Sequence, residues 1–158
     1  MASKVYVETT IVSYLTALPS RDIVQAAHQQ VTRDWWERRS RFELFVSQTV
    51  RTEAARGDPA AAGRRPDALR GISVLTITDE VTTFAEHLLR AGTMPESAAV
   101  DALHVAVAVV NGLDYLVTWN CSHIANAAIR HKIEQGCREN GFEPPIICTP
   151  EELLEDWA

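Results

Sequence analysis

The sequence has few cysteines, few lysines and no long apolar run. Its three cysteines, at positions 121, 137 and 148, are widely spaced and form no Cys-x-x-Cys pair. Neither a disulfide framework nor a cysteine zinc site is therefore predicted. No segment approaches the roughly 18 apolar residues of a membrane span, and the N-terminal segment MASKVYVETT lacks the pattern of a signal peptide. We expect a cytoplasmic protein that has no contact with membranes.

Two common phosphate-handling motifs are also missing. The chain has no Asp-x-Asp after its first predicted strand and no GxxxxGK[ST] loop, and its only lysines are Lys4 and Lys132. A receiver-like phosphotransferase or a P-loop enzyme therefore has little support.

The net charge of -6 and the pI near 5.3 do not resemble a protein that binds nucleic acid through a broad basic surface. The arginines are nevertheless bunched, in one group at 33–41 around two tryptophans and in a second group at 64–70. They are either solvated helix faces or contacts for phosphate. A metal ion in an acidic cluster would also reduce the repulsion between that cluster and phosphate.

Strands are predicted to alternate with helices along the whole chain. Short runs of β-branched, aromatic and aliphatic residues predict strands at 4–7, 42–46, 74–77, 115–118 and 146–148. Helical spacing and capping residues predict a first short helix that ends near Leu18. Further helices are predicted at 22–39, 47–57, 58–69, 79–90, 97–110, 122–140 and from 149 onward. This alternation predicts one three-layer α/β/α domain over residues 1–158, with a central parallel sheet of about five strands.

Five of the predicted helices carry further expectations. The helix at 97–110 is apolar nearly all the way round and should be buried, with a capping box at Thr93 and Glu96. A second capping box, at Thr149 and Glu152, should open a terminal helix that carries Leu153, Leu154 and Trp157. Asp22, Ser47 and Asp58 are expected to cap the helices that follow them.

Acidic residues stand where strands of such a sheet end, which is where ligands bind in open parallel sheets. Glu8 follows the first predicted strand, Glu53 lies in the helix after the second, and Asn120 follows the fourth. Asp101 lies in the most apolar helix. An ionised carboxylate in apolar surroundings is costly unless it is paired or bound to metal, and a purely structural role would require an arginine or backbone partner.

Four segments resemble the PIN-domain family, which includes VapC-type toxin ribonucleases: YVETTIVSYL, VSQTVRTEAARG, AAVDALHVAVAV and DYLVTWNCSHIAN. The family has an acidic residue and then Thr or Ser after strand one, a Glu after strand two, an Asp opening an alanine-rich helix, and an Asp after Leu-Val-Thr. Glu8, Glu53, Asp101 and Asn120 stand at these positions. Glu8 and Asn120 both replace the usual Asp.

The resemblance implies a metal-dependent endoribonuclease, and the four positions are its expected catalytic residues. Glu8, Asp101 and Asn120 would hold Mg²⁺ or Mn²⁺, and Glu53 would position or deprotonate the attacking water. The resemblance also implies a toxin of a toxin-antitoxin pair, with an RNA substrate, an antitoxin protein as partner, and a homodimeric state.

Five neighbouring residues complete the expected site. Thr9 and Thr118 would support the carboxylates through hydrogen bonds, or would only cap and turn the chain. His104, one helical turn after Asp101, is a supporting residue or a satisfied core histidine. Trp119 and His123 could contact RNA, Trp119 by stacking on a base, or could simply pack.

The two departures from the family pattern leave a second function open. Glu8 extends its carboxylate by one methylene, and Asn120 removes a negative charge and is also a favoured helix cap. The alternative is a catalytically weakened PIN domain that acts as an RNA-binding or protein-binding module.

Overall fold

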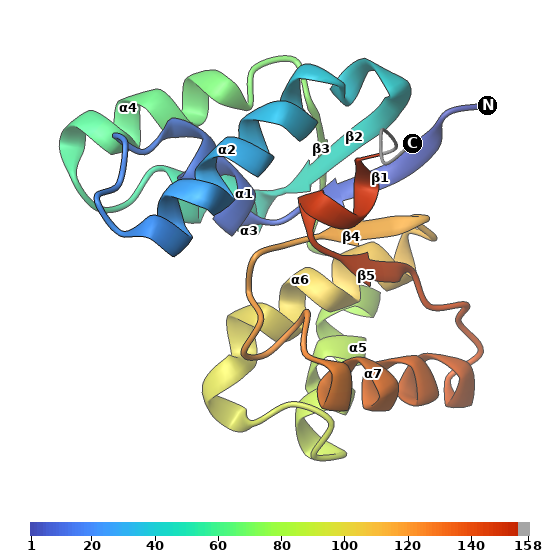
Figure 1. The fold of residues 1–158 in the computed structure, drawn as a ribbon. Helices are drawn as coiled ribbons and strands as arrows, with labels where there is room; N and C mark the ends of the chain where they lie inside the picture. Colours follow the sequence, from blue (N-terminus) through green and yellow to red (C-terminus); the bar gives the residue numbers. More distant parts are fainter. Residues whose placement is uncertain (155–158) are drawn as a thin grey trace.

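The computed structural model describes residues 1–154, which form a parallel sheet covered by helices on both faces (Figure 1). The strands are β1 Ser3–Val7, β2 Phe42–Ser47, β3 Ser73–Leu75, β4 Tyr115–Val117 and β5 Ile146–Cys148. The helices are α1 Thr9–Thr16, α2 Ile23–Glu37, α3 Gln48–Ala54, α4 Pro59–Ala68, α5 Asp79–Arg90, α6 Ala99–Val110 and α7 Ala127–Glu139. Short 3₁₀ helices are η1 Arg39–Arg41, η2 Glu96–Ala98 and η3 Pro150–Leu153. The predicted three-layer α/β architecture is confirmed.

The strand order is β3-β2-β1-β4-β5, and every neighbouring pair is parallel. The chain moves outward from β1 through β2 to β3 and then crosses to β4 and β5 on the other side of β1. The order therefore reverses between β1 and β4, where Val7 pairs with Val117. This is the topological switch point at which open α/β sheets bind ligands, and Glu8 and Thr118 are the residues that follow it.

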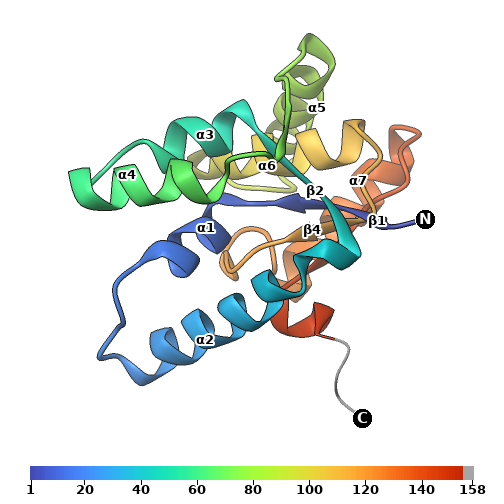
Figure 2. The ribbon, with the colours of Figure 1, turned by 90° about the horizontal axis from the view of Figure 1, so that it is seen from above.

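The helices form two layers because parallel crossovers are right-handed and the direction of travel reverses after β3. Helices α1 and α2 lie on one side of the strands, and α5 and α6 lie on the other (Figure 2). Helix α4 contacts α1 and α3. The central part of α6, 105–109, is at most 2% exposed, so the expected burial of this apolar helix is confirmed. Helix α3 lies next to α6 in Figure 2, and the two helices are in contact.

The expected caps of three helices are present. The side chains of Asp22, Ser47 and Asp58 accept hydrogen bonds from the backbone N–H groups three residues later. Each cap satisfies one of the donors that a helix N-terminus leaves without a partner, so these starts are set by local sequence.

Two predicted helix starts are wrong. The helix expected from Ser122 begins at Ala127 with Asn126 as its cap, because residues 121–125 form turns closed by N–H groups that donate to Asn120. The capping box expected at Thr93 does not form. The N–H groups of Thr93 and Met94 donate to the Leu88 carbonyl and close α5 instead, and α6 begins without a side-chain cap.

The C-terminal capping box is present, with the Glu152 carboxylate accepting a hydrogen bond from Thr149 N at 3.0 Å. It opens the short η3 rather than a longer helix within the described residues. Leu153 ends η3, Leu154 follows it, and Trp157 lies outside the described residues. None of the helices in residues 1–154 has the length and apolar character needed to cross a bilayer.

Candidate active site

Glu8 lies directly after β1, is only 3% exposed, and caps the N-terminus of α1. One carboxylate oxygen, Oε1, accepts all of its hydrogen bonds: from the N–H and hydroxyl of Thr10, and from the Thr118 hydroxyl at 2.6 Å. These three donors compensate the burial of an ionised carboxylate. Oε2 accepts no hydrogen bond from residues 1–154.

Glu53, on α3, is held in a similar way from two other elements. Its Oε1 lies 2.6 Å from the Thr9 hydroxyl and 2.6 Å from Nε2 of His104 on α6. Burial by itself raises the pKa of this carboxyl, but the hydrogen bonds from His104 and Thr9 lower it, and the pKa lies below its ordinary value. Oε2 again has no hydrogen bond within the described chain.

Asp101 lies in the first turn of α6, where the helix dipole favours a negative charge. Its side chain is 21% exposed, and Oδ2 lies 2.9 Å from Nδ1 of His123. The carboxylate is therefore paired, as expected for an acid in an apolar helix, but its partner is His123 rather than the arginine or backbone group that a purely structural role was expected to require. The other oxygen, Oδ1, has no partner among residues 1–154.

Asn120 shapes the turn that follows β4. Its Oδ1 accepts a hydrogen bond from His123 N at 3.0 Å, and its own N–H donates to the Thr118 hydroxyl at 2.9 Å. The side chain of Asn120 thus closes a turn, and the helix cap that the sequence left open for Asn120 is provided by Asn126 instead. An amide oxygen has a second lone pair, so the turn does not use up its capacity to bind a further group.

The four expected positions belong to one ring of hydrogen bonds and chain connections. The ring passes from Glu8 through Thr118, Asn120, His123 and Asp101, along α6 to His104, and back through Glu53 and Thr9. Each of its three carboxylates is anchored through one oxygen and leaves the other without a hydrogen bond. The ring lies at the carboxyl end of the sheet, at the switch point between β1 and β4.

The donor chemistry of the ring fits a hard divalent cation, since the three unbonded groups are carboxylate oxygens. Within residues 1–154, however, no three His, Cys, Asp or Glu side chains come close enough to hold one ion together. Mg²⁺ in proteins commonly keeps several waters and uses one or two carboxylates. The ring therefore fits an ion that is held by one or two carboxylates and water, and not an ion enclosed by protein ligands.

Known structures share this architecture. One is a chain of VapBC2 from Rickettsia felis, whose crystal structure was determined with a bound DNA fragment from its promoter. The alignment covers 92% of this chain and 98% of that chain, with a TM-score of 0.60 and 15% sequence identity. Another is the Mycobacterium tuberculosis toxin VapC20, which cleaves the sarcin-ricin loop. The alignment covers 75% of this chain and 91% of VapC20, with a TM-score of 0.59 and 20% sequence identity. The chain has a VapC-like PIN fold. No family model and no curated protein matches its sequence.

In this PIN fold Trp119 packs against α2. Its ring stacks on His28 with centroids 4.0 Å apart and planes 12° apart, and its indole N–H donates to the Thr32 hydroxyl at 2.7 Å. Tyr14 meets both rings edge-on. These contacts support the interpretation that Trp119 packs within the fold. An RNA contact of Trp119 or His123 stays a prediction.

The second arginine group is used in part to hold α4 in place. Arg64 donates to the Thr16 carbonyl at 2.9 Å and Arg65 to the Arg56 carbonyl at 2.7 Å. These contacts tie α4 to the end of α1 and to the segment after α3, so Arg64 and Arg65 are not simply solvated side chains on a helix face.

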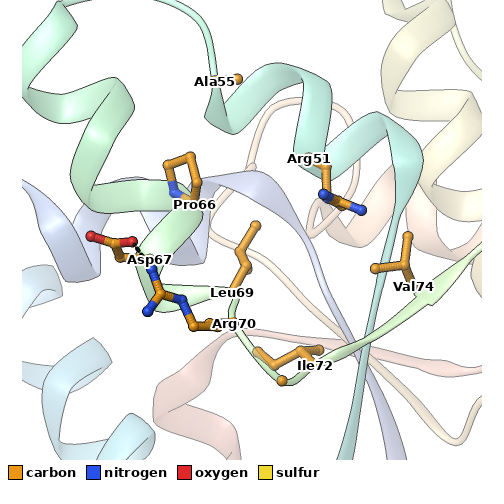
Figure 3. Close-up of a pocket in the computed structure, with 9 residues that line it drawn as sticks. Arg51, Ala55, Pro66, Asp67, Leu69, Arg70, Ile72 and Val74 are labelled. Atoms are coloured by element: carbon orange, nitrogen blue, oxygen red, sulfur yellow. Dashed lines mark hydrogen bonds and ion pairs between the residues drawn. The ribbon is translucent and has the colours of Figure 1, made fainter.

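A cavity of about 500 Å³ lies between α3, α4 and β3 (Figure 3). It is lined by the apolar Leu69, Ile72 and Val74 and by two arginines, Arg51 and Arg70, the latter paired with Asp67 at 2.7 Å. No member of the ring lines this cavity. The candidate site is therefore defined by the converging carboxylates of the ring and not by the cavity.

Sequence reasoning missed two residues behind the ring, Tyr6 and Ser47. Both are fully buried and hydrogen-bonded to one another, and Tyr6 also contacts His104. The sequence predicted Tyr6 only as a strand residue and Ser47 only as a helix cap. One signal was available, because a tyrosine inside a buried strand requires a partner for its hydroxyl.

Proposed function

We propose that this chain is a divalent-metal-dependent endoribonuclease that hydrolyses RNA phosphodiester bonds. The observation that carries the proposal is the ring, in which Glu8, Glu53 and Asp101 are each fixed through one oxygen and keep the other available. Such anchoring preorganises ligands and a base at small cost when substrate binds. The fold shared with a toxin that cleaves the sarcin-ricin loop supports the same function.

Each residue of the ring has a role in this proposal. Glu8, Asp101 and the Asn120 amide oxygen would hold Mg²⁺ or Mn²⁺, with water completing the coordination. The ion would supply Lewis-acid activation of water and would neutralise charge on the phosphate. Glu53 Oε2 would orient the attacking water and accept its proton, because this oxygen has no hydrogen bond within residues 1–154.

The remaining members orient these groups. Thr118 and Thr10 fix the rotation of the Glu8 carboxylate, and Thr9 and His104 do the same for Glu53. His123 fixes Asp101 and is in turn placed by Asn120. Trp119 and His123, which lie close to Asn120 in the sequence, could contact the RNA.

In the same proposal the protein is the toxin of a toxin-antitoxin pair in the cytoplasm, with an antitoxin protein as its partner and a homodimeric state. The three free cysteines of the described chain agree with a reducing compartment. Leu18, Ile23 and Val24, at the connection between α1 and α2, are 74%, 83% and 58% exposed. Exposed aliphatic side chains of this kind are suited to a protein contact.

The rival function is a catalytically weakened PIN domain that binds RNA or protein without cleavage. Two observations favour it: Asn120 contributes no charge, and no three-ligand cluster forms within residues 1–154. An inactive domain would keep the ring as a structural support for the switch point.

Cleavage of a mixed RNA pool by the purified protein tests the proposal. We expect cleavage with Mn²⁺ or Mg²⁺ and none with EDTA, and we expect Asp101→Asn to abolish it. The matched control is Asp67→Asn on the surface of α4, where the carboxylate is 68% exposed. Cleavage that survives EDTA or Asp101→Asn would contradict the proposal, and RNA binding without cleavage in either metal would favour the rival.

A further inference from the structure

A chain of buried polar groups leads from the N-terminus of α3 to Glu53. Val50 N lies 3.2 Å from Ser47 Oγ, Ser47 Oγ lies 2.8 Å from the Tyr6 hydroxyl, and that hydroxyl lies 2.7 Å from Nδ1 of His104. His104 Nε2 then meets Glu53 at 2.6 Å. Ser47 and Tyr6 are fully buried and His104 is 1% exposed, so water does not compensate any of these groups from bulk solvent.

The direction of every hydrogen bond in this chain follows from its two ends. The Val50 N–H can only donate, so Ser47 Oγ accepts from it, and the Tyr6 hydroxyl is then the one acceptor among residues 1–154 within reach of the Ser47 proton. Tyr6 then donates to His104 Nδ1, which carries no proton. At the other end the ionised Glu53 carboxylate can only accept, so Nε2 of His104 carries the proton.

The other protonation states of His104 leave a group unsatisfied. A proton on Nδ1 would turn the Tyr6 proton toward Ser47, and the Ser47 proton would then lack an acceptor among residues 1–154. A neutral ring with the proton on Nδ1 would also place the bare Nε2 against the Glu53 carboxylate. Buried unpaired donors and acceptors are costly, so the arrangement selects one state.

We propose that Tyr6 and Ser47 are positioning residues that hold His104 as the neutral tautomer with its proton on Nε2. His104 thereby presents a fixed donor to Glu53 Oε1, and Oε2 has no hydrogen bond within residues 1–154. A neutral His104 adds no positive charge next to Glu53, so the negative charge of the Glu53 carboxylate is not neutralised. The consequence for turnover rests on the proposed nuclease function, whereas the tautomer of His104 does not.

Long-range ¹H–¹⁵N NMR correlation of the histidine rings in the metal-free protein tests the tautomer directly. At neutral pH we expect a pyridine-type Nδ1 and a pyrrole-type Nε2 for His104. Tyr6→Phe removes only the hydroxyl that donates to Nδ1, so the Nδ1 signal should shift from its wild-type position while Nε2, still bonded to Glu53, keeps its proton. Tyr115→Phe is the matched control, because its hydroxyl makes no hydrogen bond to residues 1–154. A wild-type His104 with a proton on Nδ1 would overturn the proposal.

RNA cleavage provides the second readout. With proper positioning lost, Tyr6→Phe should lower kcat about 10-fold and leave KM within about two-fold, because Glu53 does not bind the ground-state substrate. Tyr115→Phe should leave both unchanged. If Tyr6→Phe does not fold, Ser47→Ala replaces it, and Ser47→Thr, which restores the hydroxyl, should recover kcat.

The two readouts separate the two proposals. A wild-type protein without cleavage but with the expected tautomer contradicts the nuclease function and leaves the positioning of His104 standing. A wild-type protein that cleaves RNA, combined with a Tyr6→Phe variant that keeps both the wild-type kcat and the wild-type Nδ1 signal, contradicts the role of Tyr6 and leaves the nuclease function standing.

Discussion

The Thr118 hydroxyl lies 2.6 Å from Oε1 of Glu8 and joins the carboxyl end of β4 to that of β1. The two residues are 110 positions apart in the chain, and Thr118 is fully buried. The same hydroxyl accepts a hydrogen bond from Asn120 N. A single side chain therefore supports both the carboxylate after β1 and the turn after β4.

Thr118→Val should destabilise the protein by about 1.5–3 kcal/mol, because it removes a donor to a buried charged group with little change in volume. Urea unfolding measures the effect. Thr52→Val is the control, since the Thr52 hydroxyl is exposed and bonds only to Gln48 O in its own helix. It should cost less than about 0.5 kcal/mol. Equal losses for the two variants would mean that Thr118 does not support Glu8.

Glu53 should make stability depend on acidic pH. Its pKa in the folded protein is lowered from 4.5, so the ionised form is the one that folding stabilises. This contribution is present above pH 4.5 and is lost as the pH falls through the lower value of the folded state. The difference in unfolding free energy between wild type and Glu53→Gln should therefore shrink from pH 6 to pH 3. Glu43→Gln, at an exposed position of β2, controls for general charge effects. A difference that stays constant over this range would argue against the lowered pKa.

Asn120→Asp should raise Mn²⁺ affinity, because it adds a charged ligand at the ring and ion affinity in oxygen sites follows ligand charge. The turn should survive, since Asp caps as well as Asn does. Asn120→Ala should instead cost about 1 kcal/mol through loss of the cap. Calorimetric titration and melting curves separate the effects. If neither variant changes Mn²⁺ affinity, Asn120 only shapes the turn before His123.

The sequence was sufficient for features that depend on near neighbours. The strand at Phe42–Ser47 and the caps at Asp22 and Asp58 follow from residues a few positions apart. The parallel sheet follows from the alternation of strands and helices, and that sheet places Glu8 and Asn120 at one edge.

The turn at 121–125 could not be predicted from near neighbours in the sequence. Asn120 and Asn126 are both good caps, and the choice between them depends on the hydrogen bond between Asn120 and His123 and on the pairing of His123 with Asp101. That pairing joins a loop to α6 across 22 residues. No periodicity in the sequence reports it.

The buried chain behind Glu53 depends on strand pairing. Tyr6 pairs with Phe45 in the β1–β2 register, and Ser47 is two residues beyond Phe45 on the same face of β2. Only this register places the Tyr6 hydroxyl between Ser47 and His104. The sequence indicates a buried tyrosine and a capping serine, but not that they meet.

The most direct test of the account is the location of bound Mn²⁺, read from paramagnetic broadening of backbone amide signals in the ¹H–¹⁵N spectrum. Substoichiometric Mn²⁺ should broaden the signals of Thr9 and Asn120 first and leave those of Gly71, at the cavity, and Glu152, in η3, sharp. Asp101→Asn should remove the selective broadening, and Asp67→Asn should keep it. Broadening centred on Gly71 or Glu152, or the same pattern in Asp101→Asn, would contradict a metal site at the ring.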